Sequence, residues 1–107
     1  MQFNRKHILY ALALAILLAG VVIPALAAST TTTVDSVGNV GTFTSLVLNS
    51  NGFPVISHGG NFLKLAVCLD ATCTSATLTT VVANGSESSI VLNANGFPVI
   101  SYFDNST

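Results

Sequence analysis

The sequence contains no tryptophan, and it has no arginine after Arg5. Over residues 28–107, Lys64 is the only lysine, whereas carboxylates occur at four positions. A protein that binds nucleic acid needs several clustered cations to neutralise phosphates. The composition of this part of the chain therefore argues against a nucleic-acid partner.

Charge of either sign is scarce, since Asp, Glu, Lys and Arg make up only 7% of the chain. Residues 28–107 are rich in Ser, Thr and Asn, and they also contain many Val, Thr, Ile and Phe residues. Disordered segments combine high net charge with few β-branched and aromatic residues, whereas these residue types favour strands. The composition therefore predicts an all-β structure, and 107 residues allow one domain at most.

Residues 1–27 differ from the rest and predict an export signal. Basic residues precede an uninterrupted apolar run at 8–23, which is followed by Pro24, Ala25 and Ala27. This order is typical of a secretory signal peptide, helical in its apolar part, and the small residues place cleavage after Ala27. The run has 16 residues, fewer than the roughly 20 that span a bilayer. A retained membrane anchor is the alternative.

Export has consequences for where the protein works. The mature chain is expected to be secreted, periplasmic or at the cell surface, and to meet the membrane only transiently through the signal segment.

A 13-residue phrase occurs twice in the remaining chain and predicts a repeat. Residues 45–57 and 89–101 are identical at 11 of 13 positions and are spaced 44 residues apart. A fixed period of this length is close to that of one β-propeller blade. The chain is accordingly divided into the signal peptide (1–27), an N-terminal strand and loop (28–44), a first repeat (45–88) and the start of a truncated second repeat (89–107).

Turn residues separate short apolar runs within the repeat. Strands are predicted near residues 45–49, 53–58, 62–68 and 74–82. Asn51-Gly52, and in the second copy Asn95-Gly96, are strong signals for a two-residue type I′ hairpin turn, which needs positive φ at both positions. A loop is expected at 35–44, and a further turn at 59–61.

Four short antiparallel strands per repeat predict a four-stranded propeller blade, so that the fold class is a partial β-propeller. Several predicted strands are apolar on both faces, as expected of sheets that lie between neighbouring sheets. The Thr-rich residues 30–34 resemble 77–81 and are predicted to form a strand that completes the last blade of a closed ring. A small β-sandwich or a solenoid remains the alternative fold.

The repeat resembles that of secreted bacterial β-propellers of the sialidase-like or BNR-like superfamily in the broad sense. That resemblance implies a propeller fold, and the absence of tryptophan argues against the WD40 branch. The first copy departs from the pattern at residues 58–60, where the second copy keeps Tyr102 and Asp104. The matching residues are Gly41, Phe43, Thr44, Ser45, Leu46, Leu48, Asn49, Asn51, Gly52, Pro54, Ile56, Ser57, Cys68 and Cys73.

The two cysteines, Cys68 and Cys73, flank a predicted hairpin. In an exported protein such a pair predicts a disulfide. A metal site is the poorer interpretation, because no further cysteine and no nearby histidine would complete a tetrahedron. Free thiols are the remaining alternative.

Catalytic chemistry has little support in the residues. His58 has no carboxylate close in sequence and is predicted to be a surface residue beside a turn. A sialidase-type activity would need an arginine cluster for the substrate carboxylate, which residues 28–107 do not supply. We therefore expect no catalytic residue, no metal and no cofactor in this chain.

Three functions follow as hypotheses. The first is an exported, non-enzymatic propeller module that binds a protein or a glycan through its loops. The second is a piece of a secreted hydrolase or lyase whose catalytic residues lie on other blades. The third is a surface-assembly protein that associates with copies of itself through exposed strand edges.

Overall fold

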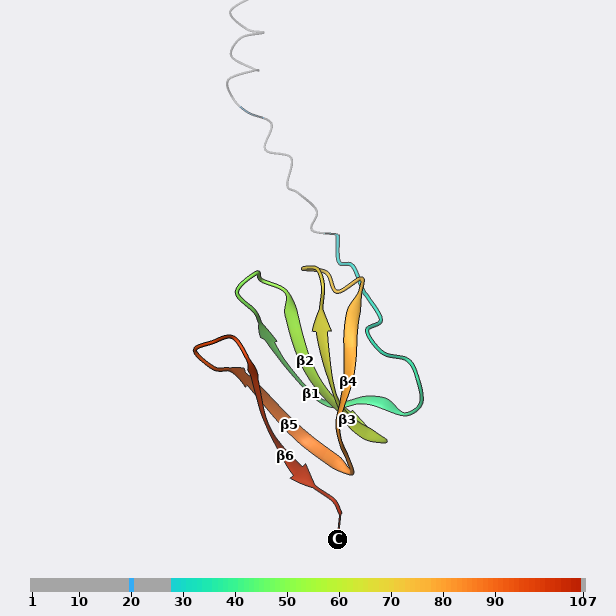
Figure 1. Ribbon diagram of the computed structural model, residues 1–107. Helices are drawn as coiled ribbons and strands as arrows, with labels where there is room; N and C mark the ends of the chain where they lie inside the picture. The colour runs from blue at the N-terminus through green and yellow to red at the C-terminus, as the bar shows by residue number, and fades with distance from the viewer. Residues whose placement is uncertain (1–19, 21–27, 107) are drawn as a thin grey trace, which may run out of the picture.

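The computed structural model describes residue 20 and residues 28–106, and this part of the chain is all-β (Figure 1). The predicted signal helix and its cleavage site at Ala25 and Ala27 lie outside the described residues, Gly20 excepted. No helix within the described part is both long and apolar enough to cross a membrane. The strands are β1 (Val40–Leu48), β2 (Pro54–Gly60), β3 (Phe62–Cys68), β4 (Ala76–Ala83), β5 (Gly85–Leu92) and β6 (Pro98–Asp104).

The strands form two antiparallel sheets. The first sheet has the order β1-β2-β3-β4, so each strand pairs with its neighbour in sequence, and the second sheet is the hairpin β5-β6. The antiparallel, all-β class predicted from the sequence is confirmed. Fully buried side chains include Leu63, Ala66 and Cys68, which places β3 at the centre of the packed structure.

The strand boundaries confirm one prediction and correct others. β3 covers residues 62–68 as predicted. β1 begins at Val40, inside the segment predicted as a loop, and β2 continues through Gly59 and Gly60, where a turn was predicted. These two residues stay in the sheet because they pair with Thr42 and Val40 of β1.

The position of Gly60, at the end of β2, leaves no room for a side chain. Its φ is 155°, and a Cβ atom there would lie 2.0 Å from the carbonyl oxygen of Asn39. The chain can therefore enter β1 this close to the end of β2 only when residue 60 has no side chain.

The predicted N-terminal strand is wrong for the described structure. Residues 28–39 contain no strand. Thr33, Val34 and Asp35 instead line a hollow with residues of β1 and β2. This segment is held by side-chain contacts over one face of the first sheet, and not by a ladder of backbone hydrogen bonds along an edge.

The two copies of the repeated phrase form the same hairpin in the same register. In the first copy Ser45 pairs with Ser57 and Val47 with Val55. In the second copy, 44 residues later, the corresponding pairs are Ser89 with Ser101 and Val91 with Val99. The sequence repeat is therefore also a structural repeat.

A shared irregularity strengthens this equivalence. The register shifts between Thr42 and Ser45 in β1, and it shifts between Ser86 and Ser89 in β5. Within each bulge one non-glycine residue has positive φ: Phe43 at 47° and Glu87 at 50°. A bulky residue rarely adopts this conformation. Its recurrence 44 positions later, with a different side chain, shows that the side chain at the centre of the bulge does not determine it.

The second sheet stacks on one face of the first, and β5 packs against β1 and β2. Ser88 Oγ lies 2.9 Å from Ser57 Oγ, and the amide of Ile90 donates to Ser45 Oγ at 3.2 Å. Ile90 and Val55 are buried. Because side chains alternate between the faces of a strand, this contact joins two different faces of the repeat.

We call these the receiving face and the docking face. The receiving face consists of Ser45, Val47, Val55 and Ser57 in the first copy and of Ser89, Val91, Val99 and Ser101 in the second. The docking face consists of Thr44, Leu46 and Leu48 in the first copy and of Ser88, Ile90 and Leu92 in the second.

Candidate functional site

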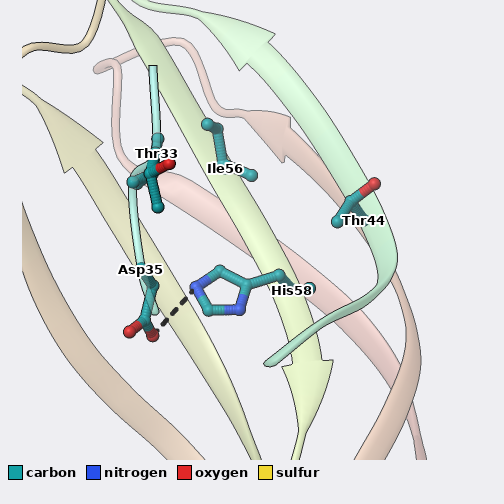
Figure 2. A pocket seen from close by; sticks show the side chains of 7 residues that line it. Thr33, Asp35, Thr44, Ile56 and His58 are labelled. Carbon is teal, nitrogen blue, oxygen red and sulfur yellow. Dashed lines mark ion pairs between the residues drawn. The ribbon is translucent and has the colours of Figure 1, made fainter. Parts of the chain in front are cut away.

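A hollow of about 260 Å³ lies between the N-terminal segment and the face of the first sheet that points away from the second sheet (Figure 2). Figure 2 shows the imidazole of His58 beside the carboxylate of Asp35, with Ile56 on the same strand as His58 and Thr44 on the neighbouring strand β1. The lining is mostly apolar apart from these groups and the threonine hydroxyls. The full lining is Thr33, Val34, Asp35, Gly41, Thr44, Ile56 and His58.

His58 is buried, which corrects the prediction of a surface histidine. Only 4% of the residue is exposed, and neither Nδ1 nor Nε2 has a hydrogen-bond partner within the described residues. Burial follows because β2 is an internal strand and the segment with Asp35 lies over it. The equivalent position in the second copy, Tyr102, has no such cover and is exposed.

Asp35 is the centre of a small charged cluster. Its Oδ2 accepts a 2.7 Å hydrogen bond from Lys64 Nζ and lies 3.8 Å from His58 Nε2. Its Oδ1 accepts from the amide of Val37 at 3.1 Å. The pKa of Asp35 lies below its usual 3.8. The hydrogen bond from Lys64 is the largest cause, the bond from the Val37 amide is the next, and burial opposes them.

The cluster arises from strand pairing. His58 and Lys64 are directly opposite each other on β2 and β3, so their side chains lie on one face of the sheet. Asp35 reaches both from the overlying segment. An ionised carboxylate between two basic groups holds the segment on the sheet, and the free imidazole nitrogens offer polar contacts to a small group in the hollow.

A metal ion has no evident set of ligands there. Within residues 28–106, no three side chains of the types His, Cys, Asp and Glu come together as a metal-binding group.

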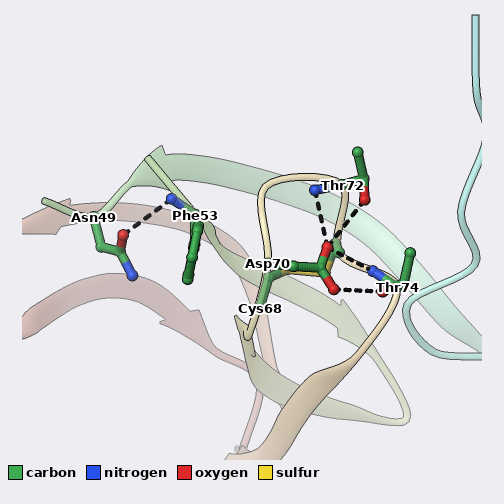
Figure 3. Close-up of a disulfide and its surroundings, with 7 residues drawn as sticks. Asn49, Phe53, Cys68, Asp70, Thr72 and Thr74 are labelled. Carbon is green, nitrogen blue, oxygen red and sulfur yellow. Dashed lines mark hydrogen bonds between the residues drawn. A yellow bond between two sulfur atoms is a disulfide. The ribbon is translucent and has the colours of Figure 1, made fainter. Parts of the chain in front are cut away.

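Three loops at one end of the sheets form a second candidate site, and the loop between β3 and β4 is the most elaborate (Figure 3). Cys68 and Cys73 form a disulfide, as the sequence predicted. Asp70 Oδ1 accepts from the amides of Thr72 at 2.9 Å and Thr74 at 3.1 Å, and from the Thr72 hydroxyl at 3.0 Å. Oδ2 accepts from the Thr74 hydroxyl.

These bonds affect the charge of the loop. The hydrogen bonds from Thr74, and then those from Thr72, lower the pKa of Asp70 to about 2. The loop therefore keeps its negative charge down to strongly acidic pH.

The loop between β1 and β2 uses the same device. Asn49 Oδ1 accepts from the amides of Asn51 and Phe53, both at 3.0 Å. Gly52 has a φ of 77°, whereas Asn51 is not among the residues with positive φ. The predicted type I′ turn is therefore wrong. Residues 49–53 connect the strands, the amide of Gly52 donates to the carbonyl of Asn49 at 2.9 Å, and Gly52 takes the left-handed conformation.

The loop between β5 and β6 repeats this arrangement. Asn93 Oδ1 accepts from the amides of Asn95 and Phe97, both at 3.0 Å. Gly96, with a φ of 80°, takes the place of Gly52. The predicted turn positions 51–52 and 95–96 do lie in turns, and the side chain that organises each loop is the asparagine two residues before the Asn-Gly pair.

All three loops therefore have one cap, a side-chain oxygen at position i that accepts from the amides at i+2 and i+4. They lie at the same end of the strands, because each follows an odd-numbered strand of an antiparallel pair and β5 runs alongside β1 (Figure 1). Phe97 and Leu69 are exposed on them. The result is a rigid edge that combines apolar side chains with amides and hydroxyls.

Sequence reasoning missed Asp35, Lys64 and Asp70. Asp70 could have been found, since Asp70-x-Thr72-x-Thr74 has the spacing of Asn49-x-Asn51-x-Phe53. No local signal connects Asp35 with Lys64, which are 29 residues apart. Their contact depends on where the N-terminal segment folds back.

The disulfide also bears on the environment of the protein. Disulfides persist in oxidising, extracellular-type compartments, and the Cys68–Cys73 bond indicates such a compartment for this chain.

Comparison with known proteins gives no relative: no family model, no curated protein and no solved structure matches the chain.

Proposed function

We propose that this chain is an exported, non-enzymatic β-propeller module that binds a protein or a glycan through its loops. The proposal has three parts: the propeller architecture, the site of export and the binding edge. Each part has its own support.

The architecture is supported by the repeat. A propeller blade is a four-stranded antiparallel sheet that packs face to face on the next blade. The first sheet has four strands in sequential order, and the hairpin of β5 and β6 repeats its first two strands and stacks on it. In this interpretation β5 and β6 are the first two strands of the following blade.

Secretion to the periplasm, the cell surface or the medium is supported by the disulfide and by the predicted signal peptide at 1–27. Both features are expected of a chain that matures outside the cytoplasm.

The observation that carries the binding role is the shared cap of the three loops. Side-chain oxygens of Asn49, Asp70 and Asn93 fix the loop backbones, and the disulfide closes one of them. A preordered loop loses little conformational entropy when it binds. Exposed Phe97 supplies an aromatic surface of the kind that dominates contact energy in interfaces and ligand sites.

The test is a binding screen of the purified protein against arrays of glycans and of extracellular proteins. We expect a ligand whose affinity falls roughly tenfold in Phe97→Ala. Phe103→Ala is the matched control, because Phe103 is similarly exposed but lies at the other end of β6. Absence of any ligand, or equal loss in the two variants, would contradict loop binding.

A further inference from the structure

Within residues 28–106, the contact between the two sheets uses one of two receiving faces and one of two docking faces. Val55 on the used receiving face is 3% exposed, whereas its equivalent Val99 is 51% exposed. Ile90 on the used docking face is 5% exposed, whereas its equivalent Leu46 is 57% exposed. In the part of the chain that the structure describes, each outer face of the two stacked sheets is thus an uncovered copy of one half of the interface between them.

The polar groups of the interface are duplicated as well. Ser88 Oγ contacts both Ser57 Oγ and the carbonyl oxygen of Phe43, the latter at 3.2 Å. The equivalent hydroxyls at the two ends are Thr44, in place of Ser88, and Ser101, in place of Ser57. Both are exposed.

The hydrogen bond between a backbone amide and a serine side chain also has equivalent groups at the outer faces. The amide of Ile90 donates to Ser45 Oγ, and the corresponding pair at the ends would be the amide of Leu46 and the hydroxyl of Ser89. No acceptor or donor of the internal interface has been lost at the outer faces.

We propose that a second copy of this chain docks head to tail on the first, with its Thr44, Leu46 and Leu48 seated on Ser89, Val91, Val99 and Ser101 of the first. The new interface repeats the one between the two sheets within the chain. It goes beyond ligand binding by the loops, because it uses the faces of the strands and not their ends.

The N-terminal segment shares this face of the first sheet but leaves the docking residues exposed. Asp35 contacts His58 and Lys64, and the segment reaches β1 only at the hollow that Gly41 and Thr44 help to line. Thr44, Leu46 and Leu48 remain exposed. Within the chain the stacked strand β5 likewise packs mainly on β1 and β2.

The two joined faces differ, so the contact is heterologous. Such a contact leaves one free face of each kind after every addition, and assembly continues until a ring closes or a filament forms. This property separates the proposal from a symmetric dimer and from unspecific sticking of apolar surface.

The test uses the full chain, exported to an oxidising compartment and purified from it, and measures mass by analytical ultracentrifugation over a range of concentrations. We expect concentration-dependent oligomers larger than a dimer. Val91→Asp removes the receiving face and Leu46→Asp removes the docking face. Either change alone is expected to weaken association roughly tenfold or more.

Mixing the two variants gives the sharpest result. The Leu46→Asp chain keeps its receiving face, and the Val91→Asp chain keeps its docking face, so one intact junction remains between them. We expect a 1:1 complex that does not grow further. A symmetric interface, or general aggregation, predicts no such complementation.

A control variant outside the proposed interface tests whether the loss of association is specific. Leu69→Asp changes an equally exposed apolar residue in the β3–β4 loop and should leave association unchanged. Ser101→Arg changes an exposed position on the receiving face without altering the core, and it should weaken association as Val91→Asp does. A wild-type chain that stays monomeric, variants that still assemble, or a mixture without a 1:1 complex would overturn the proposal.

Discussion

Lys64 Nζ lies 2.7 Å from Asp35 Oδ2 and joins the N-terminal segment to the middle of the first sheet. The side chain of Asp35 is almost wholly buried, and His58 Nε2 lies 3.8 Å from the same carboxylate oxygen. We expect Asp35→Asn to lower the free energy of unfolding by about 2 kcal/mol, because the partly buried ammonium of Lys64 loses its anionic partner. Urea denaturation at pH 7 measures this, and Ser36→Ala, at the exposed neighbouring position, is the control.

The same pair predicts a pH dependence. Because the folded-state pKa of Asp35 lies below 3.8, its ionised form stabilises the fold above that pH, and this stability is lost as the pH falls through the lower folded value. Between about pH 5 and acid pH the wild type should lose more stability than Asp35→Asn does. Parallel curves for the two proteins would show that the carboxylate contributes nothing.

We expect Asp70 to stabilise its loop mainly by accepting hydrogen bonds from backbone amides, and less by its negative charge. In the other two loops an asparagine, Asn49 or Asn93, makes the same bonds. Asp70→Asn should therefore retain slow hydrogen exchange at the amides of Thr72 and Thr74, whereas Asp70→Ala should accelerate it. The expectation is wrong if both variants exchange alike.

The disulfide is expected to stabilise the fold modestly. It encloses a short loop, with a sequence separation of 5, and the chain-entropy estimate for so small a loop is about 2 kcal/mol. Replacing Cys68 and Cys73 together by alanine should cause a loss of this size in urea denaturation. Reductant should destabilise the wild type and leave the double variant unaffected.

Gly52 is needed for its backbone conformation and not for space. Its φ is 77°, and nothing lies within 4 Å of an added Cβ. A left-handed conformation costs most L-residues roughly 1–2 kcal/mol, whereas asparagine tolerates it better. Thermal unfolding should show a clear loss for Gly52→Val and a smaller one for Gly52→Asn. Equal stability of Gly52→Val and the wild type would contradict this assignment.

The sequence predicted those parts of the fold that depend on local pattern. The duplicated phrase forms equivalent hairpins, β3 covers the predicted residues 62–68, and the cysteines pair across the hairpin that they flank. Each of these features is determined by residues within a few positions of one another.

Features that depend on distant contacts were not predictable. His58 is polar and beside two glycines, which indicates a turn, yet pairing with β1 extends β2 through them. Its burial depends on Asp35, which folds back over the sheet from outside the repeat. The bulge at Phe43 likewise has no turn residue at its centre, and only the structure of both copies makes it apparent.

The most direct test of the central claim, that two equivalent hairpins stack head to tail within the chain, is a set of nuclear Overhauser contacts in the purified Leu46→Asp variant, whose missing docking face prevents contacts between copies. We expect contacts from the Ile90 amide to the Ser45 side chain and between the side chains of Ser88 and Ser57, with none from Val91 to the first sheet. Contacts from Val91 in place of Ile90 would mean that the hairpin packs with its other face, and the account would be wrong.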